Sequence, residues 1–354
     1  MPFMNSNPLV SVILPIRNEE RTISNTLDSI LLQDYGLDNI EIIIADGLSN
    51  DDTISIIEDY RNQYKNIKII KNHKKIVPTG FNLALNISIG DVIIRVDGHT
   101  SIASDYIKTC VKKLYEKKAS NVGGLMTAIS NNFLGKLIVI ATSSVFGVGN
   151  SYFHYSKTGR WVDTVYLGAW KRDVFFEIGG FDEDLVRNQD DEFNFRLVQN
   201  GGRIWLDPLI KSQYKPRSTL RKLFSQYFQY GLYKVRVLQK RKGIASYRQL
   251  VPPIFSLFLI FSFFISMKTQ IPILILSLTY LPVNIIFSFL SSKKIKSNYF
   301  VNKILSFFLF PLIFFTLHLS YGLGYLFGFL FFIKKWGDYK TYDSCFDLKN
   351  FKHT

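Results

Sequence analysis

An aspartate and a histidine stand two residues apart at the end of a hydrophobic run, where both could bind one metal ion. The run Asp91-Val-Ile-Ile-Arg-Val-Asp97-Gly98-His99 predicts a buried strand that ends at Asp97. Ligands of parallel α/β sheets bind beyond the carboxyl ends of the strands, and carboxylate oxygen and imidazole nitrogen are both metal ligands. We therefore interpret Asp97 and His99 as ligands of a divalent metal that carries a diphosphate. The alternative is an ordinary polar turn, in which Asp, Gly and His are common.

Three more apolar runs predict strands of the same sheet, at Leu9–Pro15, Ile40–Ala45 and Ile67–Ile70, and Val92–Val96 makes the fourth. Helical spacing follows the first strand at 22–32 and the second from residue 53 onward. This alternation predicts an α/β fold with a mostly parallel sheet and helices on both faces. Polar residues after strands one, two and four then gather at one edge of the sheet.

Asp46 ends the second predicted strand and could accept a hydrogen bond from a base or a ribose. The residues Ser49, Asp51 and Thr53 are better explained as caps of the helix that follows. No Gly-x-Gly-x-x-Gly pattern follows the first strand and no P-loop pattern occurs in the sequence, which disfavours dinucleotide binding and P-loop ATPase chemistry.

The net charge of +15 suits either a nucleic acid or an anionic membrane surface. The composition decides between them, because from Val251 onward the chain is mostly Phe, Leu, Ile and Ser. We expect a membrane partner and no nucleic acid. The two cysteines predict no disulfide framework, and the first residues do not have the pattern of a cleaved signal peptide.

Three apolar runs predict membrane spans near 251–267, 271–290 and 304–333, because a spanning helix needs about 20 apolar residues. We place the domain boundary at 245/246, with a domain at 1–245 and a membrane region at 246–354. Buried helices of a soluble core are the disfavoured alternative, since the runs leave no polar face. The third run suits one tilted helix or a re-entrant pair, and the side of the C-terminus is left open.

Basic residues flank these runs and predict which side of the membrane the first domain occupies. They cluster before the first run and between the second and third, which by the positive-inside rule places the domain in the cytoplasm and makes the chain a multi-pass cell-membrane protein. The two clusters are Lys234, Arg236, Lys240, Arg241, Lys242 and Arg248, and Lys293, Lys294 and Lys296.

Basic, aromatic and apolar residues at helical spacing across 217–242 predict an amphipathic helix that lies on the membrane, with an ordinary surface helix as the alternative. Gln226 of this segment is a candidate substrate-binding residue. Trp170 could stack on an acceptor sugar, whereas Trp205 is better explained as a core residue.

Ordered motifs across residues 9–240 resemble family 2 glycosyltransferases with the GT-A fold. They are Ser11-Val-Ile-Leu-Pro-Ile-Arg-Asn-Glu19, Ile44-Ala-Asp46-Gly-Leu-Ser-Asn-Asp51-Asp-Thr53, Gly90–His99, Gly179-Gly-Phe-Asp-Glu183 and Gln189-Asp-Asp-Glu-Phe-Asn-Phe-Arg196. The segments Arg95–His99, Arg187–Glu192 and Gly202–Pro208 are most similar to succinoglycan-type glucosyltransferases that build bacterial exopolysaccharide.

The resemblance implies a role for each matching residue. Pro15, Arg17, Glu19 and Asp46 would hold uracil and ribose. Asp97 and His99 occupy the Asp-x-Asp position of the family and would hold Mg²⁺ or Mn²⁺ with the diphosphate. Asp190 matches the catalytic base of the Glu-Asp pair, Gln189 replaces its Glu, and the adjacent Asp191 stays an alternative base.

One metal and one base without an enzyme nucleophile imply a single displacement with inversion at the anomeric carbon. The expected enzyme is a metal-dependent transferase that moves a hexose, glucose by resemblance, from UDP-glucose to a polyprenyl-diphosphate-linked saccharide in exopolysaccharide or cell-surface glycan synthesis. No Gln-x-x-Arg-Trp motif occurs, which favours one sugar per encounter. The alternative, motivated by Gln189 and His99, is a non-catalytic nucleotide-binding scaffold of a polysaccharide assembly complex.

Overall fold

The computed structural model describes residues 7–351 except 150, 217, 244–246, 267, 296–299, 343–344 and 349–350. It contains two compact units. The sheet unit comprises Met1–Thr127, Ser156–Lys215 and Lys340–Thr354, and the helical unit comprises Ala128–Tyr155 and Pro216–Tyr339. The two units alternate along the chain, so the predicted boundary at 245/246, which rests on composition, stays a prediction. Lys296 and the end of the predicted span 251–267 lie outside the described residues.

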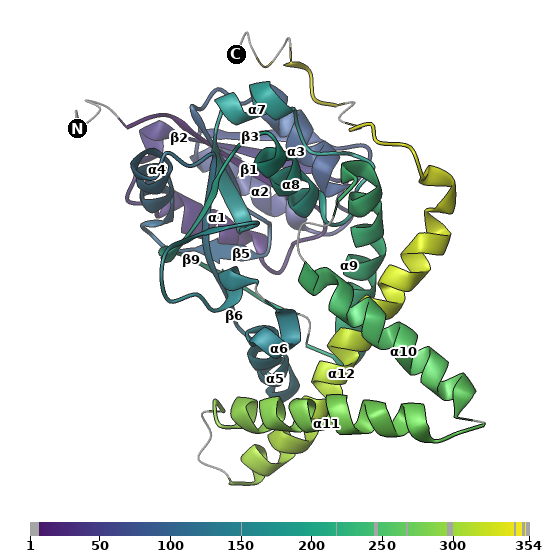
Figure 1. Ribbon diagram of the computed structural model, residues 1–354. Coiled ribbons are helices and arrows are strands. Elements are labelled where there is room, and N and C mark those ends of the chain that lie inside the picture. The colour runs from purple at the N-terminus through teal and green to yellow at the C-terminus, as the bar shows by residue number, and fades with distance from the viewer. Residues whose placement is uncertain are drawn as a thin grey trace. The chain divides into compact units, whose positions relative to one another are not determined.

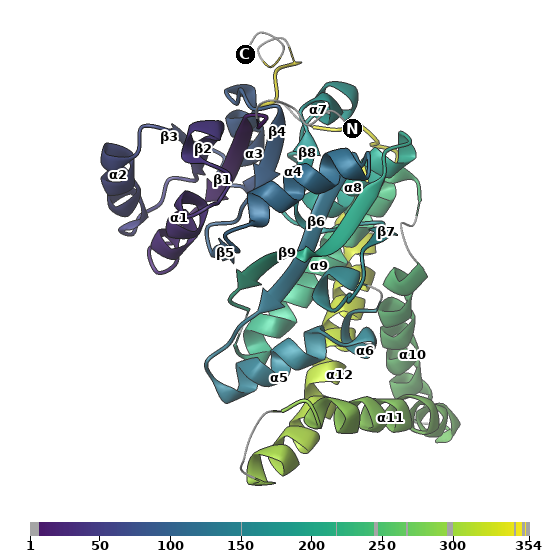
Figure 2. The same ribbon diagram turned by 90° about the vertical axis from the view of Figure 1, so that its left-hand side faces the viewer.

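One sheet of nine strands runs through the described part of the sheet unit, in the order β3-β2-β1-β4-β8-β6-β9-β5 with β7 beside β9 (Figure 2). The strands are β1 Val10–Ile16, β2 Ile40–Asp46, β3 Ile67–Lys71, β4 Val92–Arg95, β5 Thr100–Ile102, β6 Asn121–Ala128, β7 Arg160–Val162, β8 Tyr166–Lys171 and β9 Ile204–Tyr214. The four predicted strands are confirmed as β1 to β4.

The sheet is mixed. Strands β1 to β4 pair in parallel, whereas β4 with β8, β8 with β6, and β9 with β5 and β7 are antiparallel. The parallel part brings the ends of β1 and β2 level, since Ile16 lies opposite Asp46, and Arg95 of β4 lies opposite Ile13. The predicted α/β class is confirmed, and its parallel character is confined to the first four strands.

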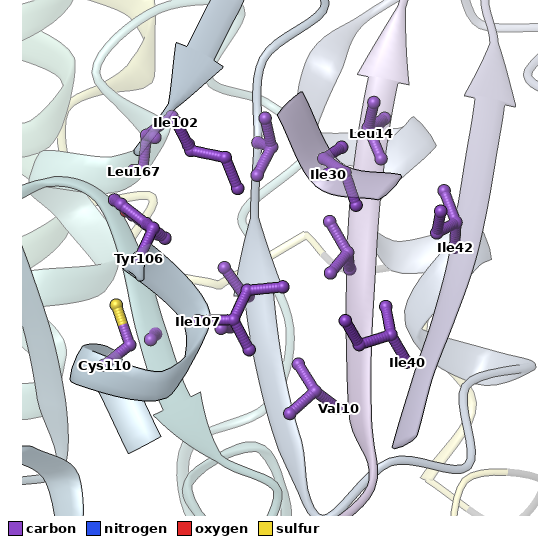
Figure 3. Packing of buried hydrophobic residues seen from close by; sticks show 14 of the residues in the cluster. Val10, Leu14, Ile30, Ile40, Ile42, Ile102, Tyr106, Ile107, Cys110 and Leu167 are labelled. Carbon is purple, nitrogen blue, oxygen red and sulfur yellow. The ribbon is translucent and has the colours of Figure 1, made fainter. Parts of the chain in front are cut away.

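Helices with one apolar face flank these strands (Figure 1). Those of the sheet unit are α1 Ile23–Leu31, α2 Thr53–Gln63, α3 Val77–Asn86, α4 Tyr106–Glu116, α7 Asp173–Ile178 and α8 Gln189–Gln199. Figure 3 shows Leu14 of β1 and Ile42 of β2 packing with Ile30 of α1, all with no exposed surface. This core fixes the strand ends from which the polar loops emerge.

The helical unit contains α5 Phe133–Thr142, α6 Val145–Val148, α9 Leu220–Arg241, α10 Val251–Ile265, α11 Ile271–Ser292 and α12 Phe300–Phe331. The segment 304–333 lies largely in α12, which continues through Pro311, so of the two alternatives the structure has the single helix. Helix α9 follows the predicted amphipathic segment, and its position on a membrane surface stays a prediction.

Two helices of the described chain, α11 and residues 301–331 of α12, are long and apolar enough to cross a membrane. Their hydrophobic side chains face outward: Leu278 and Phe308 are each 67% exposed. In α11 the buried side chains are small and polar, as Asn284 and Ser288 are, whereas α12 also buries Phe310 and Phe314. Helix packing through small and polar residues with apolar residues outside is the pattern of membrane bundles. The helical unit is therefore suited to a membrane environment.

Candidate active site at the edge of the sheet

The turn from β4 to β5 carries Asp97 and His99 beyond the carboxyl end of a buried strand, as the sequence predicts. Gly98 lies between them against β1 and the loop after it. A Cβ atom at Gly98 would lie 2.8 Å from Ile16 and 2.9 Å from Glu19. The carbonyl of Gly98 accepts a hydrogen bond of 3.0 Å from the hydroxyl of Thr26. The turn is therefore held in one place by close packing that only glycine permits.

His99 is oriented by Glu19, which comes from the loop after β1. Their Nδ1 and Oε1 atoms are 2.9 Å apart, and Oε2 of the same carboxylate accepts a bond of 2.9 Å from Thr22. A neutral imidazole that donates its Nδ1–H to a carboxylate presents the lone pair of Nε2, which is the usual arrangement around a metal-ligating histidine. This contact gives Glu19 a second possible role beside the predicted nucleotide contact.

Arg95 binds one acid of the site and is influenced electrostatically by a second. Its guanidinium is largely buried and holds Oδ1 of Asp97 at 2.8 Å through both Nε and Nη2. Burial lowers the pKa of Arg95, but the negative charges of Asp97 and Asp190 outweigh it and raise that pKa. The structure thus places the predicted metal ligand Asp97 and the predicted base Asp190 in the field of one buried cation.

Sequence reasoning missed Arg95 as a site residue. The signal was a charged residue inside an otherwise apolar strand, because an arginine is almost never buried unless it is paired.

The loops after β1 and β2 are joined to each other by hydrogen bonds. Asp46 is 4% exposed and accepts from Ser49 Oγ at 2.6 Å, and Ser49 Oγ in turn accepts from the backbone N–H of Asn18 at 2.9 Å. Thr53 Oγ1 accepts from the N–H of Glu19 at 2.7 Å. Helix α2 has Asp52 as its N-cap without a side-chain bond. The capping prediction holds for Asp51, whose Oδ1 accepts from the N–H of Thr53 at 3.1 Å at the start of α2, whereas Ser49 and Thr53 join the two loops.

The other two residues of the predicted nucleotide pocket belong to the same strand end. Pro15 is buried in β1, opposite Ala45 of β2, and Gly80 of α3 packs against its ring. Arg17 is exposed in the next loop, and its side chain lies against Gly47. Pro15 therefore shapes the floor of the strand end, and Arg17 has the exposure that a ligand contact requires.

Asp190 and Asp191 lie in the first turn of α8, which begins after Asn188. Both are partly buried, and Oδ1 of Asp190 accepts from the N–H of Asp191 at 3.0 Å. Glu192 has no exposed surface and pairs with Arg196 one turn later at 3.1 Å. The acidic run thus contains a buried ion pair, Glu192 with Arg196, and two partly buried aspartates at the start of the helix.

Two more residues, Trp170 and Gln226, are predicted to bind substrate. Trp170 is 1% exposed in β8 and packs edge-on against Phe81, Phe181 and Phe193. Its ring has no face left for a sugar, so the acceptor role of Trp170 is wrong. Gln226 belongs to α9 of the helical unit, where its Nε2 donates to Tyr230 at 2.8 Å.

The residues of this edge fit a divalent metal only together with a substrate. No group of three or more His, Cys, Asp or Glu side chains in the described chain is arranged to hold a metal ion alone. Arg95 occupies Oδ1 of Asp97, which makes Oδ2 the candidate ligand beside His99. Mg²⁺ is commonly bound by one or two carboxylates plus substrate phosphates and water, and the set Asp97 and His99 matches that number.

A mixed sheet that is parallel in its first half, with acids at the carboxyl ends of its strands and at the start of a later helix, is the GT-A fold. In a structural comparison the mannosyltransferase PcManGT from Pyrobaculum calidifontis, solved with GDP-Man and Mn²⁺, matches with a TM-score of 0.59 at 18% identity, covering 90% of this chain and 88% of that one. This similarity supports the fold.

The chain belongs to glycosyltransferase family 2. Residues 11–165 match the family described as "Glycosyl transferase family 2". The dolichyl N-acetyl-alpha-D-glucosaminyl phosphate 3-beta-D-2,3-diacetamido-2,3-dideoxy-beta-D-glucuronosyltransferase of Methanococcus voltae is 32% identical over 239 residues, 65% of this chain and 74% of that protein. The succinoglycan biosynthesis protein ExoA of Rhizobium meliloti (strain 1021) is 28% identical over 255 residues, 70% of this chain and 77% of that protein.

Proposed function

We propose that this glycosyltransferase is a membrane-bound, metal-dependent, inverting hexosyltransferase. It moves glucose from UDP-glucose to a polyprenyl-diphosphate-linked saccharide in the synthesis of an exopolysaccharide or cell-surface glycan. The catalytic domain faces the cytoplasm, where nucleotide sugars are made. The site residues of the enzyme are the ones predicted in the sequence analysis, except Trp170.

The observation that carries the proposal is the buried guanidinium of Arg95. It contacts Asp97 at 2.8 Å, and the charge of Asp190 raises its pKa, although these acids lie in the turn after β4 and in α8, far apart in sequence. A sugar transferase needs a charged group at the leaving diphosphate and a base at the acceptor hydroxyl, with the anomeric carbon between them. In this site Asp97 would act at the diphosphate and Asp190 at the acceptor hydroxyl, and the charge of Arg95 acts on both.

In the proposed reaction the acceptor oxygen forms a bond to the anomeric carbon while the bond from that carbon to the diphosphate oxygen breaks. Asp190 takes the proton of the acceptor hydroxyl as this bond forms. Asp97 and His99 would hold Mg²⁺ or Mn²⁺, which as a Lewis acid offsets the charge that builds on the diphosphate. Glu19 keeps the imidazole of His99 in position, and Arg17 and Asp46 hold the nucleoside end of the donor.

The lipid-linked acceptor is supported by two separate observations. The relative from Methanococcus voltae is named for a dolichyl phosphate acceptor, and the relative from Rhizobium meliloti is named for succinoglycan. The helical unit exposes apolar side chains on helices of spanning length, as a protein that meets its acceptor in a membrane would.

The test is release of UDP from UDP-glucose by the protein purified in detergent, with Mn²⁺, Mg²⁺ or EDTA and with or without lipid extract from the host membrane. We expect release that needs both metal and lipid. The variant Asp97→Asn should lose about 10²-fold or more of this turnover, because charge on the diphosphate is no longer offset. Asp105→Asn, an exposed residue before α4, is the matched control and should keep it.

Each other outcome changes the proposal in a defined way. Protection of the protein against thermal unfolding by UDP-glucose, without release under any condition and with any acceptor extract, would favour the nucleotide-binding scaffold. Neither protection nor release would remove UDP-glucose as the donor. Full turnover in Asp97→Asn would remove Asp97 from the metal site.

A further inference from the structure

The last residues of the chain pack on the sheet unit, although the helices of the helical unit separate them from it in sequence. Residues 340–354 belong to the sheet unit, and Phe351 has no exposed surface. Its ring lies 4.7 Å from that of Phe176 in α7, between ring centroids, and 5.3 Å from that of Phe346. A buried aromatic side chain is a strong anchor for an otherwise extended segment.

Arg172, which follows β8, covers the other side of the Phe351 ring. Its guanidinium carbon is 3.8 Å from the ring centroid, and its Nη2 donates to the carbonyl of Phe351 at 2.7 Å. The Nη1 atom of Arg172 donates to Ser88 of the sheet unit at 2.6 Å. One arginine thus joins the last part of the chain to the loop after α3 by a cation–π contact and hydrogen bonds.

A second set of bonds holds the tail, the described residues between Lys340 and Phe351, at positions that come earlier in the sequence. The buried carboxylate of Glu183 accepts from the N–H of Cys345 at 2.8 Å, and the N–H of Glu183 donates to the carbonyl of Tyr342. The amide of Asn86 donates to the carbonyl of Cys345, and its Oδ1 accepts from the N–H of Asp347 at 2.9 Å. The backbone N–H and C=O groups of the tail therefore form hydrogen bonds with residues of α3 and of the loop before α8.

From this packing we infer that the described residues between Lys340 and Phe351 are a fixed part of the sheet unit, so that the helical unit crosses the membrane an even number of times. A folded domain does not pass through a bilayer, so segments of one domain lie on one face of it. The chain leaves the sheet unit after Lys215 and returns at Lys340, and both points must then lie on the same face. This decides the side of the C-terminus, which the sequence alone leaves open.

An even number of crossings has a consequence for the three apolar helices α10, α11 and α12. At least one of them does not cross. Helix α10 is the shortest, with 15 residues, and a crossing needs about 20. Two helices of the described chain have spanning length, which agrees with an even count. Lys334 and Lys335, which directly precede the tail, would share the face of the sheet unit, in agreement with the positive-inside rule if that face is cytoplasmic.

The first test measures the face on which each segment lies. Cys110→Ala and Cys345→Ala remove both native thiols, and single cysteines replace Leu32 and Leu348, which are exposed in the sheet unit and in the tail. A membrane-impermeant maleimide is applied to right-side-out and to inverted membrane vesicles. We expect both cysteines to react in the same vesicle type and neither in the other. Reaction from opposite faces would overturn the inference. The result does not depend on glycosyl transfer, so it stands or falls separately from the proposed function.

The second test measures docking of the tail in the full chain. Asn86→Cys in a Cys110→Ala background places a thiol next to the native Cys345, and a short bis-maleimide should join the two, as detected by mass spectrometry of the linked peptides. Phe351→Asp should lower the yield about tenfold or more, since it removes the buried anchor. Leu348→Asp, which changes an exposed residue of the same tail, should leave the yield unchanged. Equal yields in both variants would mean that the tail is not held as described.

Discussion

The two units differ in how much apolar surface their side chains expose. In the sheet unit Leu14 of β1 and Ile42 of β2 have no exposed surface, and charged groups lie at the strand ends. In the helical unit Leu278 of α11 and Leu330 of α12 are 67% and 68% exposed, whereas Ser288 and Ser320 are buried. The first arrangement is that of a water-soluble domain, and the second is that of a bundle surrounded by lipid.

This difference assigns the chemistry of the protein to the sheet unit and its location to the helical unit. The acids and the arginine that could act on a nucleotide sugar are all in the sheet unit. In α11 of the helical unit, two buried polar side chains bond to one another and to the backbone: Asn284 donates to the carbonyl of Pro311 at 3.1 Å, and Ser288 donates to Asn284 at 3.2 Å. Polar side chains used in this way join helices.

The largest effect is expected from Asp190→Asn, which should lower kcat by about 10²–10⁴-fold because the acceptor hydroxyl loses its base. The matched control is Asp191→Asn, the next residue of the same helical turn. We expect Asp191→Asn to keep most of the activity, as measured by initial rates at saturating UDP-glucose. Unchanged melting temperatures in both variants would show that the sheet unit is intact. The opposite result, with loss of activity only in Asp191→Asn, would identify Asp191 as the base.

The second prediction compares the same substitution in the two units. Leu14→Ala should lower the free energy of unfolding by about 2–5 kcal/mol, because it opens a cavity in a closely packed core. Leu278→Ala should change it by less than about 0.5 kcal/mol in detergent, because its side chain is exposed. Denaturant unfolding followed by a probe in each unit gives both values. A comparable loss for Leu278→Ala would mean that α11 is buried by a partner.

The sequence predicts the parts of this molecule that obey a local period. Strands β1 to β4 are runs of buried Ile and Val, and α10 to α12 are long apolar runs, so both follow from composition and spacing. The turn Asp97–His99 was also predictable, because polar residues after a buried strand must lie at the edge of the sheet. Its metal ligation stays a prediction.

What could not be predicted depends on contacts between distant residues. No local pattern indicates that Trp170 is enclosed by Phe81, Phe181 and Phe193, because these residues come from three different segments. The apolar helix α5, between β6 and β7, belongs to the helical unit, where Leu137 packs with Phe310 and Phe314 of α12. A run of ten residues is too short to distinguish a membrane-side helix from a core helix.

The third prediction concerns the close contact of α9 with α12. A Cβ atom at Gly231 would overlap the carbonyl of Tyr321, and one at Gly324 would overlap that of Phe228. Gly231→Ala should therefore lower the unfolding free energy of the helical unit by about 1–3 kcal/mol, as overpacking does. Ser225→Ala, at an exposed position of the same helix, is the control. Equal stability of the two variants would mean that α9 and α12 can separate without cost.

The fourth prediction concerns the carboxylate of Glu183, whose side chain is 3% exposed. Burial raises the pKa of Glu183, but hydrogen bonds from Lys74, Asn82, the N–H of Cys345 and Thr79 outweigh it and lower that pKa from its usual value of 4.5. A folded pKa below the unfolded one stabilises the fold above pH 4.5, and this contribution is lost as the pH falls through the folded pKa.

Glu183→Gln should therefore cost about 1–3 kcal/mol at neutral pH, and the difference from the parent protein should shrink as the pH falls below that value. Glu177→Gln, which changes an exposed glutamate of α7, should show no such change. Thermal unfolding measured across this pH range checks both. A deficit in Glu183→Gln that stays constant as the pH falls would mean that the charge of Glu183 contributes nothing and that its bonds to α3 and the tail act as neutral contacts.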